Sequence, residues 1–113
     1  MEIISQHKCF NGTQGFYKIE STSIGLPMTF SVYVPPQAKN QKVPVLFYLA
    51  GLTCTEETFM IKGGAQRYAA EHGLMLFSCD TSPRRTGIKG AADSWDFGHG
   101  AGFYLDATQQ PWA

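Results

Sequence analysis

Few residues of this chain occupy positions where chemistry is expected, and Cys54 is the first of them. It follows a small-residue turn after an apolar run and directly precedes a predicted helix, where the positive end of the helix dipole can activate a thiol. A reactive or pocket-lining thiol is one interpretation, and a quiet, partly buried cysteine is the other. Cys79, at the end of a second apolar run, is most simply a small core residue.

A second group of candidates lies in a segment rich in glycine and aromatic residues near the C-terminus. Asp93 and Asp96 form a carboxylate pair that could do acid–base work, although the residues around them suit a hydrogen-bonded loop anchor equally well. His99 stands between two glycines of the same segment. About 30 residues without clear periodicity are unusual inside a compact domain and are more often functional than not.

The motifs that most directly identify a catalytic or nucleotide-binding site do not occur. The sequence has no G-x-S-x-G elbow, no G-x-G-x-x-G after a strand, no G-x-x-x-x-G-K-[ST] loop and no H-E-x-x-H pair. Cys9, Cys54 and Cys79 are scattered without C-x-x-C spacing, which disfavours both a disulfide framework and a zinc site. A reducing, intracellular setting is therefore expected.

The composition indicates one small domain with more apolar surface than its length can easily enclose. The chain has 113 residues, of which nine are basic and nine acidic, and its net charge of zero gives no reason to expect a nucleic-acid or membrane partner. Charged residues make up 16% of the chain, against roughly 25% in an average soluble protein. We expect part of a larger domain, or a chain with a partner. The polar N-terminus is no signal peptide and no stretch is long enough for a membrane helix, so a soluble, cytoplasmic protein is predicted.

The elements that must position the candidates follow an α/β pattern. The first third of the chain predicts antiparallel strands, closed by a turn signal at Asn11-Gly12. The later part predicts two short helices, with Gly73 as the residue that ends the second one. The predicted strands are Ile3–Phe10, Gly15–Ser21, Met28–Val34 and Leu74–Cys79, and the predicted helices are 55–62 and 65–72.

The centre of this pattern is Val45–Leu49, a run of five apolar residues. Such a run is typical of a strand buried on both faces inside a parallel sheet. Thr53-x-x-Glu56 then has the spacing of a capping box, and Thr55 is a second N-cap candidate. Strand, helix and strand together predict a right-handed βαβ unit. Its turn lies at the C-terminal edge of a sheet, where open α/β folds bind their ligands.

Several long segments of the chain, in order, resemble one family. The resemblance is to S-formylglutathione hydrolase, also called esterase D, and it covers nearly the whole chain. The segments that carry it are Leu49–Glu57, Gly64–Gly73, Asp80–Arg84, Ser94–Gly98, Gly100–Tyr104, Asp106–Gln109 and Pro111-Trp112.

The resemblance implies an α/β-hydrolase fold and a serine thioesterase. Members of the family hydrolyse S-formylglutathione to formate and glutathione in formaldehyde detoxification. A Ser-His-Asp triad acts there without metal or organic cofactor, and the full-length protein is expected to be a homodimer.

By the same resemblance, all three triad residues belong after Ala113, so no catalytic residue is expected within this chain. The chain is expected to supply one backbone donor of the oxyanion hole, the N–H of Leu52. The substrate pocket implied by the resemblance takes in Gly51, Cys54, Trp95, Asp96, Phe97 and Phe103.

The sequence departs from the family pattern at three places. Arg84-Arg85 stands where the pattern usually runs Arg-Gly, which affects a turn that needs a positive φ. His99 replaces a small or polar residue. Phe77-Ser78-Cys79 replaces a more usual apolar-Ala-Pro run.

We therefore expect residues 1–113 to be the N-terminal portion of a single α/β-hydrolase domain. Alone it is expected to be inactive and to fold poorly, because much of a parallel sheet and its covering helices would be missing. Two alternatives stay open. One is a non-catalytic truncated product that acts as an interaction partner through an exposed sheet edge. The other is a general carboxylesterase of the same fold.

Overall fold

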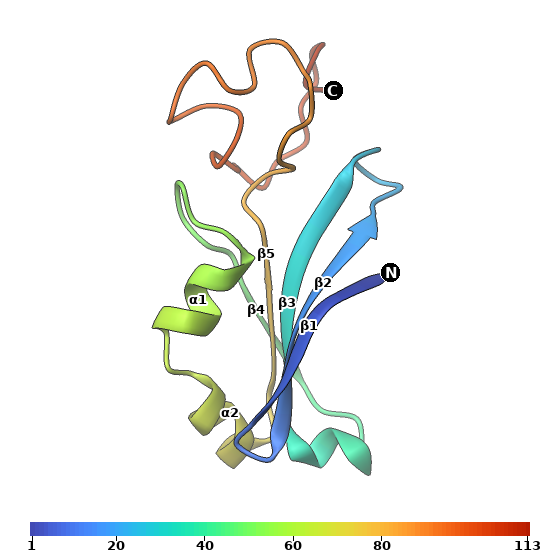
Figure 1. Cartoon of the computed structure of the whole chain (residues 1–113), viewed down its shortest axis with the longest axis vertical. Helices are drawn as coiled ribbons and strands as arrows, with labels where there is room; N and C mark the ends of the chain where they lie inside the picture. The colour runs from blue at the N-terminus through green and yellow to red at the C-terminus, as the bar shows by residue number, and fades with distance from the viewer.

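The computed structural model describes all 113 residues and shows one mixed sheet with two helices on one of its faces (Figure 1). The strand order is β1-β2-β3-β5-β4. β1, β2, β3 and β5 are antiparallel neighbours, whereas β4 and β5 are parallel. The elements are β1 (Glu2–Cys9), β2 (Gly12–Glu20), β3 (Pro27–Val34), the 3-10 helix η1 (Pro36–Lys39), β4 (Val45–Tyr48), α1 (Glu56–Lys62), α2 (Gln66–His72) and β5 (Met75–Cys79).

The first hairpin turns one residue earlier than predicted. Phe10 and Asn11 both have left-handed backbones, with φ of 44° and 61°, as a two-residue hairpin turn of the primed type requires. Gly12 already belongs to β2 and is needed for space, since a Cβ there would lie 2.3 Å from the carbonyl oxygen of Val34. The Tyr33 hydroxyl donates a 3.1 Å hydrogen bond to the Cys9 carbonyl and holds the turn against β3.

The covered face of β3 is not the one that its apolar residues form. Ser31 and Tyr33 are fully buried beneath the helices, and the Ser31 hydroxyl donates to the Glu56 carbonyl at the start of α1. On the other face Phe30 stacks between Tyr17 and Phe77, with ring centroids 5.4 and 5.5 Å apart. The predicted alternation is correct, but this chain's helices cover the face that carries the serine and the tyrosine.

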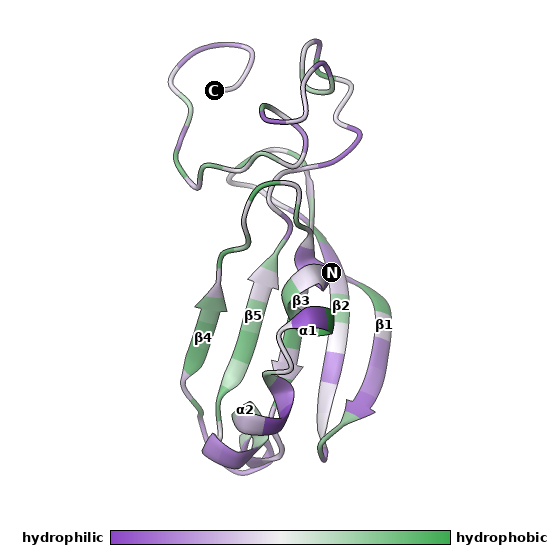
Figure 2. Ribbon diagram, turned by 90° about the vertical axis from the view of Figure 1, so that its left-hand side faces the viewer, coloured by the Kyte–Doolittle hydropathy of each residue, from purple (hydrophilic) through white to green (hydrophobic).

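The prediction that Val45–Leu49 is a strand buried on both faces is wrong for this structure. The strand β4 ends at Tyr48, lies at the edge of the sheet and is exposed at every residue, with Phe47 66% exposed. Figure 2 shows the helices over β3 and β5, leaving β4 as an uncovered hydrophobic strand. Tyr48 stacks on Phe59 of α1, with ring centroids 4.0 Å apart.

The predicted βαβ unit is otherwise present. Val45 of β4 pairs with Met75 of β5 in parallel register, and α2 ends at Gly73 with φ of 65°, as expected for a C′ glycine. The N-cap of α1 is Thr55, whose hydroxyl accepts from the Glu57 amide. A capping box therefore exists, but not the one that Thr53-x-x-Glu56 predicted. Neither helix has the length and apolar character needed to cross a membrane.

Candidate active site

Three loops come together at the carboxyl end of the parallel strands β4 and β5. They are residues 50–54 after β4, residues 80–84 after β5, and residues 98–104 of the irregular segment that forms the upper part of Figure 1. Parallel neighbours end at the same sheet edge, so the first two loops are adjacent by topology. The third is brought to them by hydrogen bonds.

The loop after β4 has both hydrogen-bonded and free backbone amides. The Thr53 N–H donates to the Gly100 carbonyl at 2.7 Å, and the Cys54 N–H donates to the Gly51 carbonyl at 3.1 Å. The N–H groups of Gly51 and Leu52 have no acceptor within the chain. Thr53 adopts a left-handed backbone, with φ of 66°. The loop therefore places unpaired backbone donors directly after a strand.

An ion pair behind this loop fixes its far end. Arg84 donates to both carboxylate oxygens of Asp80, over 2.7 to 3.1 Å, and Asp80 is only 3% exposed. The same guanidinium donates to the Cys54 carbonyl at 3.0 Å, which also accepts from the Thr81 hydroxyl at 2.7 Å. Because two side chains hold one carbonyl, the peptide after Cys54 has a single orientation.

The third loop, residues 98–104, packs against the loops after β4 and β5. The Gly100 N–H donates to the Ser82 hydroxyl at 2.8 Å, and the Tyr104 hydroxyl donates to the Ala50 carbonyl at 2.7 Å. Gly102 lies so close to the loop after β5 that a Cβ would be 1.7 Å from the Thr81 carbonyl oxygen. Glycine is therefore a steric requirement of this contact.

The Tyr104 hydroxyl is also electrostatically coupled to the site. Burial raises its pKa, and negative charge on Cys79 and Asp80 raises the pKa further. The neutral hydroxyl, which donates to Ala50, is therefore favoured over the phenolate.

The structure gathers some of the predicted pocket residues and separates others. Phe97 and Phe103 line one cleft of about 430 Å³ between the loops, together with Tyr104. Trp112 packs edge-on against Phe97 with ring centroids 5.0 Å apart. The remaining four predicted residues, Gly51, Cys54, Trp95 and Asp96, are not among those that line this cleft.

Two other chemical candidates of the irregular segment, Asp96 and His99, act as loop anchors. Asp96 accepts a hydrogen bond from the Ser94 hydroxyl. A ring nitrogen of His99 is 3.2 Å from the Thr86 hydroxyl, and the His99 N–H donates to the Ala91 carbonyl. No group of three or more His, Cys, Asp or Glu side chains is arranged to hold a metal ion.

Sequence reasoning did not single out Asp80, Thr81, Arg84 or Tyr104. The pair of Asp80 and Arg84 had a signal in the sequence, because Asp80 follows a predicted strand and an arginine stands four positions later. That spacing alone does not indicate which backbone carbonyl the arginine reaches.

The family model described as "Putative esterase" matches residues 21–113. The chain belongs to this esterase family. It is 52% identical over 112 residues to the S-formylglutathione hydrolase of Paracoccus denitrificans, covering 99% of this chain and 40% of that protein. It is 51% identical over 109 residues to the rat (Rattus norvegicus) S-formylglutathione hydrolase, covering 96% of this chain and 39% of the relative.

A solved structure supports the same assignment. The chain superposes on the S-formylglutathione hydrolase of Agrobacterium tumefaciens with a TM-score of 0.93 and 48% identity, covering 99% of this chain and 40% of that one. This match confirms the predicted α/β-hydrolase fold and the resemblance to S-formylglutathione hydrolase. The esterase-family chain thus spans about 40% of the length of the relatives that it matches.

Proposed function

We propose that this chain supplies the oxyanion loop of an S-formylglutathione hydrolase, with the Leu52 N–H as a donor. The observation that carries the proposal is the free amide of Leu52 in the loop after β4, where the Gly51 amide is also free and the following amides of Thr53 and Cys54 are already bonded. About half of the residues are identical to curated S-formylglutathione hydrolases, which supports the same substrate class.

The reaction is the hydrolysis of a thioester. A serine hydroxyl, expected outside these residues, adds to the formyl carbon, and the carbonyl oxygen becomes an oxyanion. The Leu52 N–H and the amide of the residue after that serine stabilise this charge. Glutathione then leaves as its thiol, and water hydrolyses the formyl-serine ester to formate. One such donor contributes roughly 3–4 kcal/mol to the transition state of a complete site.

Several residues of this chain position the donor without touching the reacting atoms. The Thr53–Gly100 hydrogen bond and the contacts of Arg84 and Thr81 with the Cys54 carbonyl hold the loop after Leu52. The Tyr104 hydroxyl holds the Ala50 carbonyl before it. A donor fixed before the reaction needs no reorganisation when the charge develops.

The biological setting follows from the same proposal. The substrate is S-formylglutathione, the process is formaldehyde catabolism, and the complete protein is a cytoplasmic homodimer that needs no metal or organic cofactor. Nucleic acid and membranes are not partners.

The proposal is tested in a chimera in which residues 1–113 replace the matching 40% of the Agrobacterium tumefaciens enzyme. Incorporating the α-hydroxy acid of leucine at position 52 exchanges the N–H for an oxygen and keeps the Leu52 side chain. We expect kcat for S-formylglutathione to fall about 10²–10³-fold with little change in KM. The same exchange at Lys42, in the loop before β4, is the control. Equal kcat values for the chimeras with the backbone ester at position 52 and at position 42 would show that the Leu52 N–H is not part of the oxyanion hole.

The apolar cleft favours a second candidate, a general carboxylesterase. Phe97 and Phe103 line it together with other hydrophobic residues, and such a cleft suits an acyl group larger than formyl. Comparing kcat/KM for S-formylglutathione and short acyl esters in the chimera separates the two activities. A preference for butyrate over formyl esters would favour the carboxylesterase.

The uncovered strand β4 favours a third candidate, a non-catalytic interaction partner. All four of its residues are exposed, and an unpaired edge can accept a further strand.

A further inference from the structure

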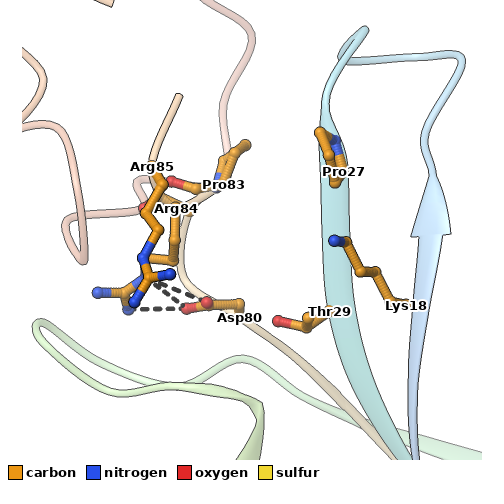
Figure 3. A pocket seen from close by; sticks show the side chains of 8 residues that line it. Lys18, Pro27, Thr29, Asp80, Pro83, Arg84 and Arg85 are labelled. Carbon is orange, nitrogen blue, oxygen red and sulfur yellow. Dashed lines mark hydrogen bonds and ion pairs between the residues drawn. The ribbon is translucent and has the colours of Figure 1, made fainter. Parts of the chain in front are cut away.

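A polar cleft with three cations and one anion lies on the other side of the loop after β5 (Figure 3). Its volume is about 320 Å³, and no large hydrophobic side chain lines it. Lys18 of β2 and Thr29 of β3 form one wall, and Asp80, Arg84 and Arg85 form the other. Figure 3 shows the Lys18 ammonium and the Thr29 hydroxyl pointing toward the arginines.

Only one of the three cations is neutralised within the chain. Arg84 donates to both oxygens of Asp80, whereas Lys18 and Arg85 have no carboxylate within 4.0 Å, since the ion pairs of the chain involve other residues. Glu2 is the register partner of Lys18 on β1, yet it neither lines the cleft nor pairs with the lysine. Three positive charges less one negative charge leave a net charge of +2 in the cleft.

The backbone of Arg85 is held in an unfavourable conformation. Its φ is 52°, and the left-handed region costs a residue with a Cβ roughly 1–2 kcal/mol. The side chain is exposed and makes no hydrogen bond that offsets this cost. Strained residues of this kind are concentrated at ligand clamps and active sites.

We propose that this cleft binds a small oxyanion, a carboxylate or a phosphate group, between Arg85 and Lys18. A guanidinium presents two parallel donors that match either group, and an ammonium adds a compact charge. The Thr29 hydroxyl has no partner in the chain and is a further donor from the strand wall. A bound anion offsets the repulsion of two unpaired cations that face the same cavity.

The site is distinct from the proposed oxyanion hole. Neither Lys18 nor Arg85 belongs to the loop that carries Leu52, and the cleft does not include that loop. Arg84 lines the cleft and also holds the Cys54 carbonyl, but Lys18 and Arg85 make no hydrogen bond to that loop. Changes at Lys18 and Arg85 therefore test anion binding apart from esterase activity, and either proposal can fail without the other.

The test is a calorimetric titration of the 113-residue chain with sodium phosphate and, separately, with sodium acetate and reduced glutathione, at constant ionic strength set by sodium chloride. We expect saturable binding, weakened roughly ten- to hundredfold by Arg85→Gly or Lys18→Gln. Lys89→Gln removes an exposed cation of the same loop that does not line the cleft and is the matched control. Binding of phosphate alone identifies a phosphate ligand, and binding of acetate and glutathione identifies a carboxylate ligand.

Arg85→Gly keeps the test clear of misfolding, because glycine is relaxed at the φ of this position. Arg85→Lys is expected to recover part of the affinity. If the chain alone shows no cooperative unfolding by circular dichroism, the same titrations in the chimera decide the question. Absence of saturable binding in folded protein, or an affinity that Arg85→Gly and Lys18→Gln leave unchanged, would overturn the proposal.

Discussion

The backbone N–H of Thr53 donates a 2.7 Å hydrogen bond to the carbonyl of Gly100. This bond joins the loop after β4 to a segment that has no helix or strand of its own. A Cβ added to Gly100 would lie 3.5 Å from the Thr53 Cα, so the two segments pass close to each other. This bond leaves the Leu52 N–H free directly before the bonded amide of Thr53. The stability of each variant is measured by urea unfolding of the chimera.

Thr53 and Thr55 are expected to respond in opposite directions. Thr53→Gly should raise the free energy of unfolding by about 1 kcal/mol, because it relieves a left-handed backbone while keeping the N–H. Thr55→Ala should lower it by about 1 kcal/mol, because α1 loses its N-cap. Destabilisation by Thr53→Gly would show that the Thr53 side chain has a role beyond its backbone.

Gly102 and Gly51 form a matched pair for the close approach of the loops. A Cβ on Gly102 would be 1.7 Å from the Thr81 carbonyl oxygen, whereas one on Gly51 has nothing within 4 Å. Gly102→Ala should lower the free energy of unfolding by about 1–3 kcal/mol, and Gly51→Ala should change it by less than about 0.5 kcal/mol. Equal urea-unfolding midpoints for Gly102→Ala and Gly51→Ala would contradict the observed packing.

The two i,i+4 ion pairs of the chain should differ sharply in strength. Arg84→Ala leaves a carboxylate that is 4% exposed without its partner, and we expect a loss of about 2–4 kcal/mol. Arg67→Ala breaks the pair with Glu71, whose side chains are 66% and 54% exposed, and should cost less than about 0.5 kcal/mol. Arg84→Lys tests whether the planar guanidinium is needed, because a lysine ammonium cannot reproduce its hydrogen bonds to both Asp80 oxygens and the Cys54 carbonyl.

A double-mutant cycle isolates the Asp80–Arg84 contribution. Asp80→Asn removes the charge that Arg84→Ala leaves unpaired, so the double variant should be more stable than the sum of the single changes predicts, by at least about 1 kcal/mol. Strict additivity would mean that the two side chains do not stabilise each other.

Tyr104 is expected to limit stability at alkaline pH. Its pKa is raised above the ordinary value of 10.0 by burial and by nearby negative groups, so the folded state holds this proton more tightly than the unfolded state. The stabilisation is complete below pH 10 and is lost as the pH rises through the raised pKa. Tyr104→Phe should cost about 0.5–1.5 kcal/mol at pH 7.

The pH profile separates this role from a simple packing defect. Urea midpoints measured from pH 8 to pH 11 should decline less steeply in Tyr104→Phe than in the unaltered protein. Parallel curves would assign the alkaline loss to other groups, such as Tyr33 or Cys79, whose pKa values burial also raises.

The 113-residue chain by itself should not hydrolyse a p-nitrophenyl ester, because the family's triad residues are expected after Ala113. Turnover that a serine-directed reagent inhibits would refute this expectation. Sedimentation of the same sample tests the interaction-partner candidate. A stable, monodisperse species would favour it, and concentration-dependent aggregation through the open β4 edge would count against it.

Local signals in the sequence were enough to predict the order and type of most elements. Alternation specified β3, the C′ glycine Gly73 ended α2, and an apolar run after it began β5. Each of these features depends on residues within a few positions of one another, so a linear pattern contains the necessary information. The family resemblance carried by Leu49–Glu57 also pointed to the loop of Leu52.

The tertiary structure alone decided which faces are covered and which side chains meet. β4 is apolar enough for a buried strand, yet no element of this chain covers it, and burial depends on a neighbour rather than on the strand itself. The bond from Thr53 to Gly100, the reach of Arg84 to Cys54 and the shared cleft of Lys18 and Arg85 all join residues far apart in sequence. Such contacts depend on how the strands pair in space, which no local pattern encodes.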